Sequence, residues 1–349
     1  MTGVRSSVPV ETSEAQVPPA EGERIRRLRP SDFVQRYALV FAWGLLCLFF
    51  TVLPATSSTF PTTGNFAGIF GSQAVIVVLT LGLLIPLTTG DYDLSVAYTL
   101  SLSSMILAIL NANHHWAIGW AIVVALACAV SVGVINGALV VLLGINPFIV
   151  TLGTGTFVYG IVLWISASNT ISGVSPSLVN ITIVDRFLGI PLEFYYGLAL
   201  CVVIWYVFEF TPVGRRLLVV GRGRKVARLS GLSVGRLRWG ALIASAFVSG
   251  MAGVLYAGTT GSADPSSGSQ LLLPAFAAAF LGATSIAPGR FNPWGAFIAV
   301  YFLVTGITGL QLVGVEAFVQ QLFYGGALIL AVALAQVARR GQELDVGGN

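Results

Sequence analysis

Long apolar runs, separated by short polar segments, occupy most of the chain after residue 36. A helix needs about 20 apolar residues to cross the roughly 30 Å hydrocarbon core of a bilayer. The pattern therefore predicts an all-α, polytopic membrane protein with about ten transmembrane helices. The ten runs lie near residues 37–53, 68–88, 94–110, 116–143, 148–166, 192–210, 240–257, 271–286, 294–309 and 318–337.

The composition supports this fold class. Of the 349 residues, 56% are hydrophobic and only 9% are charged, and the mean hydropathy is +0.87. A soluble protein with so few polar groups could not cover its own surface. Cys47, Cys128 and Cys201 all fall inside apolar runs, so neither a disulfide framework nor a metal site is expected.

The basic residues predict the orientation in the membrane, because Lys and Arg accumulate in cytoplasmic segments. In a ten-span arrangement, 17 of the 18 basic residues fall in the N-terminal segment, between spans six and seven, at Arg290 or at the end of the last span. Only Arg186 lies elsewhere. We therefore expect both termini in the cytoplasm.

The chain divides into one membrane domain and two tails. Residues 1–32 are rich in Ser, Glu, Pro and Arg and lack the apolar core of a signal peptide, which predicts a disordered cytoplasmic tail. The membrane domain covers residues 33–338, and residues 339–349 form a second cytoplasmic tail. The net charge of +4 suits a face next to anionic lipid and does not indicate nucleic-acid binding.

Two short segments recur at almost the same spacing. Residues 88–95 share five identities with residues 259–266, 171 positions later, and residues 144–152 are echoed by residues 314–322, 170 positions later. About five predicted spans separate the copies, and an odd number would turn the second copy upside down. Inverted-topology halves of this kind are typical of transporters. Chance similarity between Gly- and Thr-rich turns is the alternative.

The predicted cytoplasmic loop 211–238 is long and strongly basic. Gly223 and Gly231 bound a stretch with room for a short helix, and Gly231 suits its left-handed C-terminal cap. Such a helix could insert into a groove on a soluble partner and transmit a push to spans six and seven. The alternative is a basic loop that only sets the topology.

Two acidic residues lie between the second and third predicted spans. Asp91 and Asp93 are not expected to face lipid, since a charge at mid-bilayer costs about 2.5–3.5 kcal/mol on insertion scales. Asp93 is expected to cap the third span with help from Ser95, although a position on the solute pathway is also open. For Asp91, a place in a polar turn and a place on the solute pathway are equally favoured.

Other polar residues within the spans are candidates to line a corridor. Gln73 and Asn136 are isolated amides that need a partner, either a neighbouring helix or a passing solute. Thr151 and Thr154 lie in a Gly- and Thr-rich strip that allows either close helix packing or a narrow polar path. The predicted solute-pathway residues are Gln73, Asp91, Asp93, Asn136, Thr151 and Thr154.

The chain lacks the motifs of an enzyme. Its one lysine, Lys225, is not part of a phosphate-binding GxxxxGK[ST] loop, so ATP hydrolysis would need a separate subunit. No catalytic triad or zinc-binding HExxH pattern occurs, and we predict no catalytic residue. A secondary transporter or channel is the rival from another class, with Asp91 and Asp93 as its only candidate coupling acids.

Between Ala67 and Ala338 the chain resembles the permease subunits of ribose-type monosaccharide ABC importers. The chain departs from that family at three places. Asp91 and Tyr92 stand where the family usually has Gly and Ile, and Arg222 and Gly223 stand where it has Gly and Asn. Ala283 stands where it has a second Gly. The branched-chain amino-acid permeases of the same superfamily are a close alternative. The resemblance rests on the segments Gly90–Ser95, Asn136–Gly137, Pro147–Thr154, Gly214–Leu217, Ala227–Gly231 and Leu281–Ser285.

The resemblance implies a function and a set of partners. The permease would form the solute pathway in a bacterial inner membrane, with a second permease copy, identical or different. ATP and Mg would bind to an ATPase subunit, an extracytoplasmic binding protein would deliver the solute, and this chain would hold no cofactor. The residues expected to contact the ATPase are Arg222, Arg224, Ala227, Arg228, Leu229, Ser230, Gly231 and Leu232.

Overall fold

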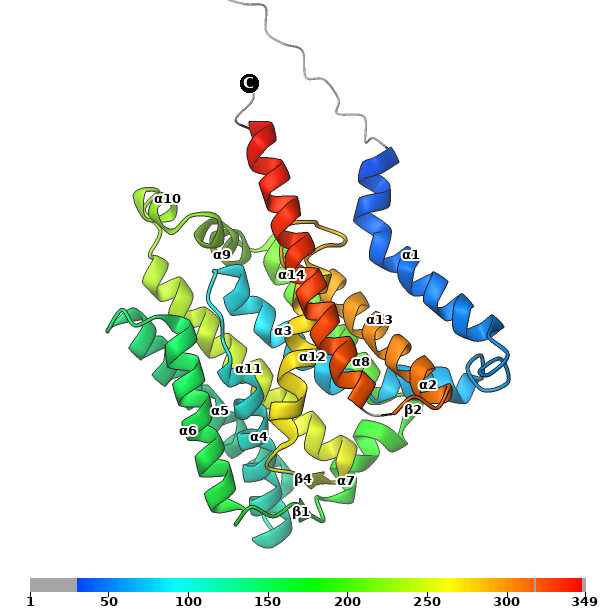
Figure 1. Cartoon of the computed structure of the whole chain (residues 1–349). Coiled ribbons are helices and arrows are strands. Elements are labelled where there is room, and N and C mark those ends of the chain that lie inside the picture. The colour runs from blue at the N-terminus through cyan, green and yellow to red at the C-terminus, as the bar shows by residue number, and fades with distance from the viewer. Residues whose placement is uncertain (1–29, 317, 347–349) are drawn as a thin grey trace, which may run out of the picture.

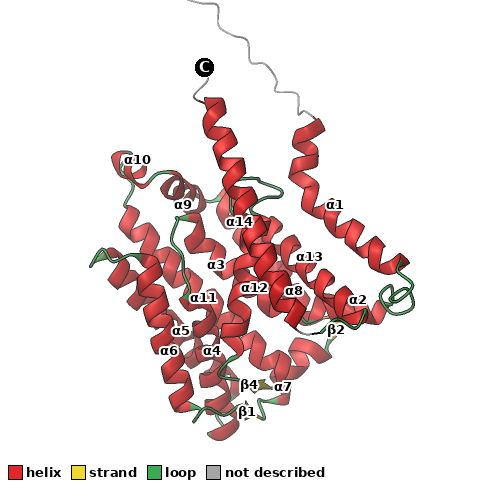
Figure 2. Cartoon of the chain, viewed as in Figure 1, coloured by secondary structure: helices red, strands yellow, loops and turns green. Residues whose placement is uncertain are grey.

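The computed structural model describes residues 30–316 and 318–346, and this part of the chain is almost entirely helical (Figure 2). The tail predicted at 1–32 lies largely outside these residues, and helix α1 already begins at Pro30. At the other end, helix α14 continues to Val346, through most of the second predicted tail.

Fourteen α-helices occur in the described residues, with two π-helical turns at Ile109–Asn113 and Asn180–Val184 and two small antiparallel ribbons. Strand β1 (Ile171–Ser172) pairs with β4 (Ser262–Ala263), and β2 (Arg186–Phe187) pairs with β3 (Ile190–Pro191). The helices are α1 (Pro30–Val52), α2 (Thr63–Gly71), α3 (Ala74–Thr88), α4 (Ser95–Ala108), α5 (Ile118–Val141), α6 (Pro147–Ile165), α7 (Pro176–Val179), α8 (Leu192–Phe210), α9 (Pro212–Arg222), α10 (Arg224–Leu229), α11 (Val234–Thr260), α12 (Ser267–Gly282), α13 (Pro293–Leu312) and α14 (Phe318–Val346).

Each of the ten predicted apolar runs coincides with a helix. Among the described residues, seven helices are long and apolar enough to cross a bilayer, if α2 and α3 are taken as one span over Thr63–Thr88. Three more apolar helical segments are shorter, at Arg36–Val52, Ser267–Gly282 and Phe318–Ala333. The all-α membrane fold is thus confirmed with seven clear spans, and the count of ten stays a prediction.

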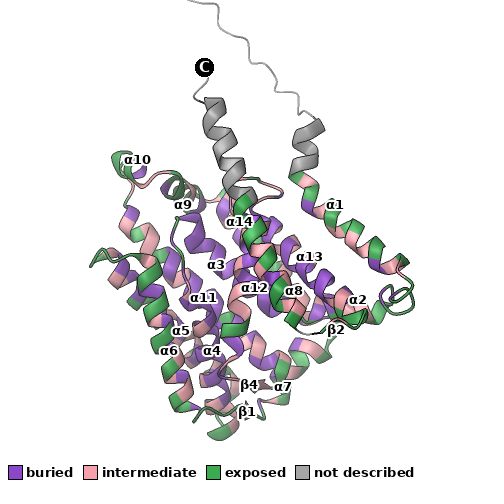
Figure 3. Cartoon of the chain, viewed as in Figure 1, coloured by how far each residue is buried: buried purple, intermediate pink, exposed green. Residues whose placement is uncertain are grey.

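The helices are arranged around α3, in which every residue is buried. Helix α11 packs along α3, α4 and α5, and α12 packs on α3, α4, α13 and α14. The outer faces of α5, α6 and α8 are apolar and exposed, as Figure 3 shows for α6, where Trp164 is 81% exposed. An apolar side chain so exposed is suited to lipid rather than water.

Local signals in the sequence set several helix starts. Helix α6 begins at Pro147, whose fixed φ suits the first turn, and the Asn146 side chain accepts a hydrogen bond from the Phe148 N–H at 2.9 Å. Asn292 caps α13 through the Gly295 N–H, and Thr211 caps α9 through the Gly214 N–H. Residues next to the helix therefore determine where α6 begins.

The two echoed segments have matching local geometry. Gly90 and Gly261 both have positive φ, as do Gly144 and Gly314. Asp93 accepts hydrogen bonds from the N–H and hydroxyl of Ser95, and Asp264 accepts the same pair from Ser266. The turn at Gly90 lies beside α10, whereas the turn at Gly261 leads into β4 at the opposite end of the molecule (Figure 1).

One predicted element is interrupted. Gln73 was expected inside the second span, but it lies at the break between α2 and α3, where its amide donates to the Ser72 hydroxyl at 2.9 Å. The neighbouring Gly71 packs so closely on Pro191 and Glu193 that a β-carbon there would lie 2.8 Å from Pro191 Cγ. The amide therefore has a local partner and sits at a helix end.

Candidate functional site

The basic loop forms two short helices, α9 and α10, at the end of the molecule where α14 and α1 also project (Figure 1). Helix α10 ends in a Schellman motif, in which the Gly231 N–H donates to the Arg228 carbonyl and the Leu232 N–H donates to the Ala227 carbonyl. Gly231 has φ +79°, a conformation that glycine adopts without steric cost. Both the short helix and its left-handed cap were predicted and are confirmed.

Helix α10 buries one side and exposes the other. Ala227 is fully buried in a small cluster with Val220 and Val234, which fixes the helix on α9 and α11. Leu229 is 89% exposed and Val226 is 65% exposed on the outer side. The remaining residues of the predicted docking set are exposed at Arg222, Arg228, Ser230 and Gly231 and half-buried at Arg224 and Leu232.

A buried carboxylate ties this loop to the core. Asp91 follows the end of α3, is fully buried, and accepts hydrogen bonds from Arg238 Nε at 2.7 Å and from Arg238 Nη2 at 2.8 Å. Arg224, the first residue of α10, donates to the same carboxylate at 2.6 Å and to the carbonyls of Thr89 and Gly90. We name these three side chains, Asp91, Arg224 and Arg238, the Asp91 clamp.

Directly after the clamp, a chain of hydrogen bonds runs through four helices. Asp93 accepts from the Ser95 hydroxyl at 2.6 Å and from the Ser245 hydroxyl at 3.0 Å. The Asn136 amide donates to Ser95 at 2.8 Å and accepts from the Thr154 hydroxyl at 2.6 Å. Because every member has a partner, this network joins α4, α5, α6 and α11 without leaving a buried polar group unpaired.

A cavity of about 390 Å³ lies in another part of the molecule. Its walls come from the start of α3, the last turns of α11, and parts of α12, α13 and α14. None of its lining residues is charged. The amide and hydroxyl side chains that line it are Ser72, Gln73, Tyr256, Thr259, Thr260, Gln270, Thr308, Gln311, Gln320, Gln321 and Tyr324.

Two acidic residues lie close to the cavity without lining it. Glu193, which is 2% exposed, accepts a hydrogen bond at 2.8 Å from Thr259, a wall residue. Asp264 lies in the loop between α11 and α12, where the Ser266 hydroxyl holds the pKa of the Asp264 carboxyl below its usual range. The Thr170 hydroxyl also donates to Asp264 at 2.9 Å, which fastens the segment before β1 to the one after β4.

Comparison with known proteins assigns the chain to a family. Residues 65–332 match the family described as branched-chain amino acid transport system / permease component. The chain belongs to this permease family. It is 30% identical over 302 residues to the D-allose transport system permease protein of Escherichia coli, covering 86% of this chain and 92% of that one.

Other relatives carry similar descriptions. The ribose import permease protein of Bacillus subtilis is 30% identical over 272 residues, which cover 77% of this chain and 84% of the relative. An autoinducer 2 import system permease protein of Photorhabdus laumondii is 27% identical over 305 residues, which cover 85% and 91%. No solved structure matches the chain. The family and the apolar helices together identify a multi-pass protein of the inner membrane.

The structure divides the predicted pathway residues of this permease among three places. Of the six, only Gln73 lines the cavity. Asp93, Asn136 and Thr154 belong to the hydrogen-bond network, and Thr151 joins it to the chain before α4 by donating to the Tyr92 carbonyl and accepting from the Leu94 N–H. Asp91 belongs to the clamp. Asp93 also caps α4 as expected, whereas a pathway role for all six residues stays a prediction.

Sequence reasoning missed most of the cavity wall. Gln270, Gln311, Gln320 and Gln321 lie near span ends, where polar residues are ordinary, so nothing in the linear pattern connected them. Arg238 was taken only as a topology charge. One signal could have pointed to two of these glutamines: Gln320 and Gln321 lie inside the echoed segment 314–322.

Proposed function

We propose that this chain is the transmembrane subunit of an ATP-binding-cassette importer and forms the translocation pathway for a monosaccharide or related polyol. The solute class is supported by relatives described as allose and ribose permeases. A branched-chain amino acid is the second candidate, favoured by the description of the family. This chain is non-catalytic and binds no cofactor; ATP and Mg belong to the partner ATPase.

The observation that carries the proposal is the structure of α10 and its pattern of buried and exposed residues. A short helix that ends in a Schellman motif, is anchored by buried Ala227 and exposes Leu229 and Val226 suits insertion into a groove of a soluble subunit. The Asp91 clamp ties its first residue to the end of the central helix α3. A displacement of α10 would therefore reach the core through an ion pair and two carbonyl contacts.

The orientation and assembly follow from the same proposal. The ATPase would bind at the α9–α10 end, which places both termini in the cytoplasm, and a binding protein would approach the β1–β4 end. Matching turns at Gly90 and Gly261 on opposite ends support two inverted halves with about ten spans. A second permease copy would complete the pathway, and lipid would contact the exposed faces of α5 and α6.

The test is assembly with the ATPase subunit that the proposal requires. A double variant, Arg228→Glu with Leu229→Asp, reverses a charge and places a carboxylate on the docking side of α10. We expect it to lose co-purification with the ATPase and solute-stimulated ATP turnover. Leu188→Asp is the matched control, because Leu188 is 83% exposed at the opposite end of the molecule. Unchanged assembly and turnover in the double variant would show that α10 is not the docking element.

A further inference from the structure

The 390 Å³ cavity lies toward the end of the permease opposite the Asp91 clamp. Its wall includes the last turn of α11, which leads into β4, and the first turns of α3 and α14. Its volume is at the lower end of the roughly 300–1,000 Å³ range of small-molecule pockets, which suits a single sugar ring. The cavity therefore has the size and the place of an outward-facing solute site.

The polar groups of the wall are available to a ligand. Gln270, Gln311 and Gln321 make no hydrogen bond to another side chain among the described residues and are exposed. Each amide offers two N–H donors and one carbonyl acceptor. Glutamines that serve only for solubility would have no reason to converge from α12, α13 and α14 on one hollow.

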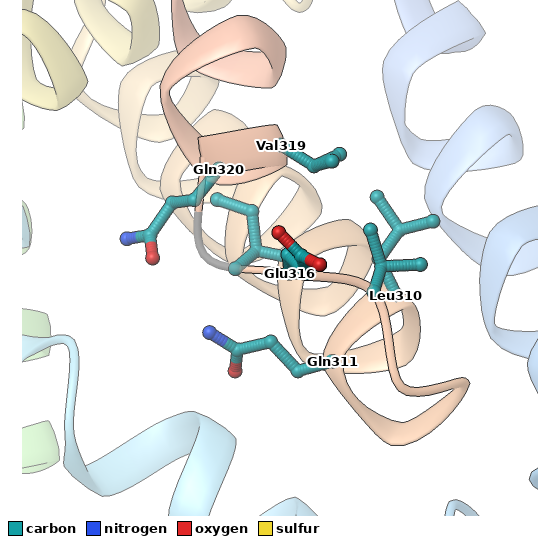
Figure 4. Close-up of a pocket in the computed structure, with 7 residues that line it drawn as sticks. Leu310, Gln311, Glu316, Val319 and Gln320 are labelled. Atoms are coloured by element: carbon teal, nitrogen blue, oxygen red, sulfur yellow. The ribbon is translucent and has the colours of Figure 1, made fainter.

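The turn between α13 and α14 carries one charged side chain, Glu316, which is not part of the cavity wall. Gln311 and Gln320 project to the same side of the turn, whereas the Glu316 carboxylate lies between the two helix ends and does not point with them (Figure 4). Gln311 and Gln320 line the cavity, and Glu316 does not.

The chemistry of the wall selects among solutes. A hydroxyl group both donates and accepts hydrogen bonds, so amides and hydroxyls can satisfy every position of a sugar or polyol. A zwitterionic amino acid would bring a carboxylate, and this group would be desolvated without an opposite charge, because the charged groups near the wall, Glu193 and Asp264, are both acidic. Tyr256 and Tyr324 add ring surface for the apolar faces of a bound molecule.

We propose that this glutamine-lined cavity is a binding site for the transported solute and that the solute is a neutral polyhydroxylated molecule of about monosaccharide size. The inference rests on the proposed function, because it treats the chain as a solute permease. It also favours a sugar or polyol over the amino-acid alternative.

The experiment measures protection of a cysteine placed in the wall. In a full-length background with Cys47, Cys128 and Cys201 changed to Ala, Gln270→Cys is alkylated with a membrane-impermeant maleimide in right-side-out vesicles. The probes are aldopentoses, aldohexoses and polyols, each tested up to its solubility limit, together with L-leucine. We expect at least one neutral probe to slow alkylation several-fold and L-leucine to have no effect.

The control is Ser57→Cys in the same background, since Ser57 is exposed in the loop between α1 and α2 and does not line the cavity. Its alkylation rate should not change with any probe. Protection of Gln270→Cys by no neutral probe, or equal protection by L-leucine, overturns the proposal. Labelling needs neither ATPase nor binding protein, so a failure of the coupling proposal would leave this result standing.

Discussion

Asp91 is the residue that ties together the end of the permease at which α9 and α10 lie. Its carboxylate is fully buried and is held by two arginines that lie 133 and 147 positions later in the chain. Arg238 binds it in a bidentate manner and is itself largely buried, with 14% of its side chain exposed. Because a buried charge is costly without a partner, the three side chains are stable only together.

Asp91→Asn tests the clamp at the level of one side chain. The amide keeps the shape but leaves two arginines without their counter-charge, so we expect a loss of about 3 kcal/mol, at the low end for breaking a buried pair. Arg224 is 40% exposed and can return to water, which limits the effect. The measurement is thermal unfolding of the purified protein in detergent.

Asp185→Asn is the control for this substitution, since Asp185 is exposed in an outer loop and forms no ion pair within the described residues. It should unfold at the wild-type temperature. Equal midpoints for Asp91→Asn and wild type would mean that the clamp contributes nothing to stability.

At the level of elements, the close approach of α11 to its neighbours depends on small residues. A β-carbon at Gly253 would overlap the Leu100 carbonyl and approach the Ser103 β-carbon to 2.8 Å, so α11 and α4 are in backbone contact there. Gly250 makes a similar contact with Ala129 of α5. Small residues at such interfaces let helices pack closely in a membrane, where apolar side chains gain little by leaving lipid.

Gly253→Ala should therefore push α11 away from α4. The expected cost is about 1–3 kcal/mol, the range for overpacking a well-packed interface. Gly240→Ala on the same helix is the matched control, because a β-carbon there meets nothing within 4 Å. Its better helix propensity should leave stability unchanged or raise it by up to about 1 kcal/mol. The measurement is thermal unfolding of both variants in detergent. It distinguishes a packing effect at Gly253 from a general effect of replacing a glycine in α11.

At the scale of the whole molecule, the two sites proposed above lie about the length of α3 apart. Helix α10 and the clamp lie at one end, and the glutamine-lined cavity lies toward the other. The hydrogen-bond network of Asp93, Asn136 and Thr154 begins two residues after Asp91 of the clamp and joins the neighbouring helices. The arrangement suits alternating access, in which nucleotide-driven movement at one end changes access to a solute at the other.

The orientation can be tested with single cysteines in the cysteine-free background. Ser230→Cys on the docking loop and Asn169→Cys near β1 are both exposed and lie at opposite ends of the molecule. We expect an impermeant maleimide to label Ser230→Cys only in inside-out vesicles and Asn169→Cys only in right-side-out vesicles. The reverse pattern would place α10 outside the cell and remove the basis for ATPase docking.

The sequence alone determined the features that depend on neighbouring residues. Apolar runs determined the helices, Asn146 and Pro147 determined the start of α6, and Gly223 and Gly231 bounded α10, because solvation, capping and positive φ act over a few positions. The family followed from ordered motifs. Even Asp93 was correctly expected to cap α4, since its partner Ser95 is two residues away.

Only the tertiary structure decided what lies across the helices. The partners of Asp91 are far away in sequence, and the amides at Gln270, Gln311 and Gln321 meet only after α12, α13 and α14 have packed. In a chain of nearly uniform apolar spans, no periodicity marks which face of a helix is inward: α3 is apolar on every side. The direction of each side chain is therefore set by helix packing, and both the clamp and the cavity exist only as its consequence.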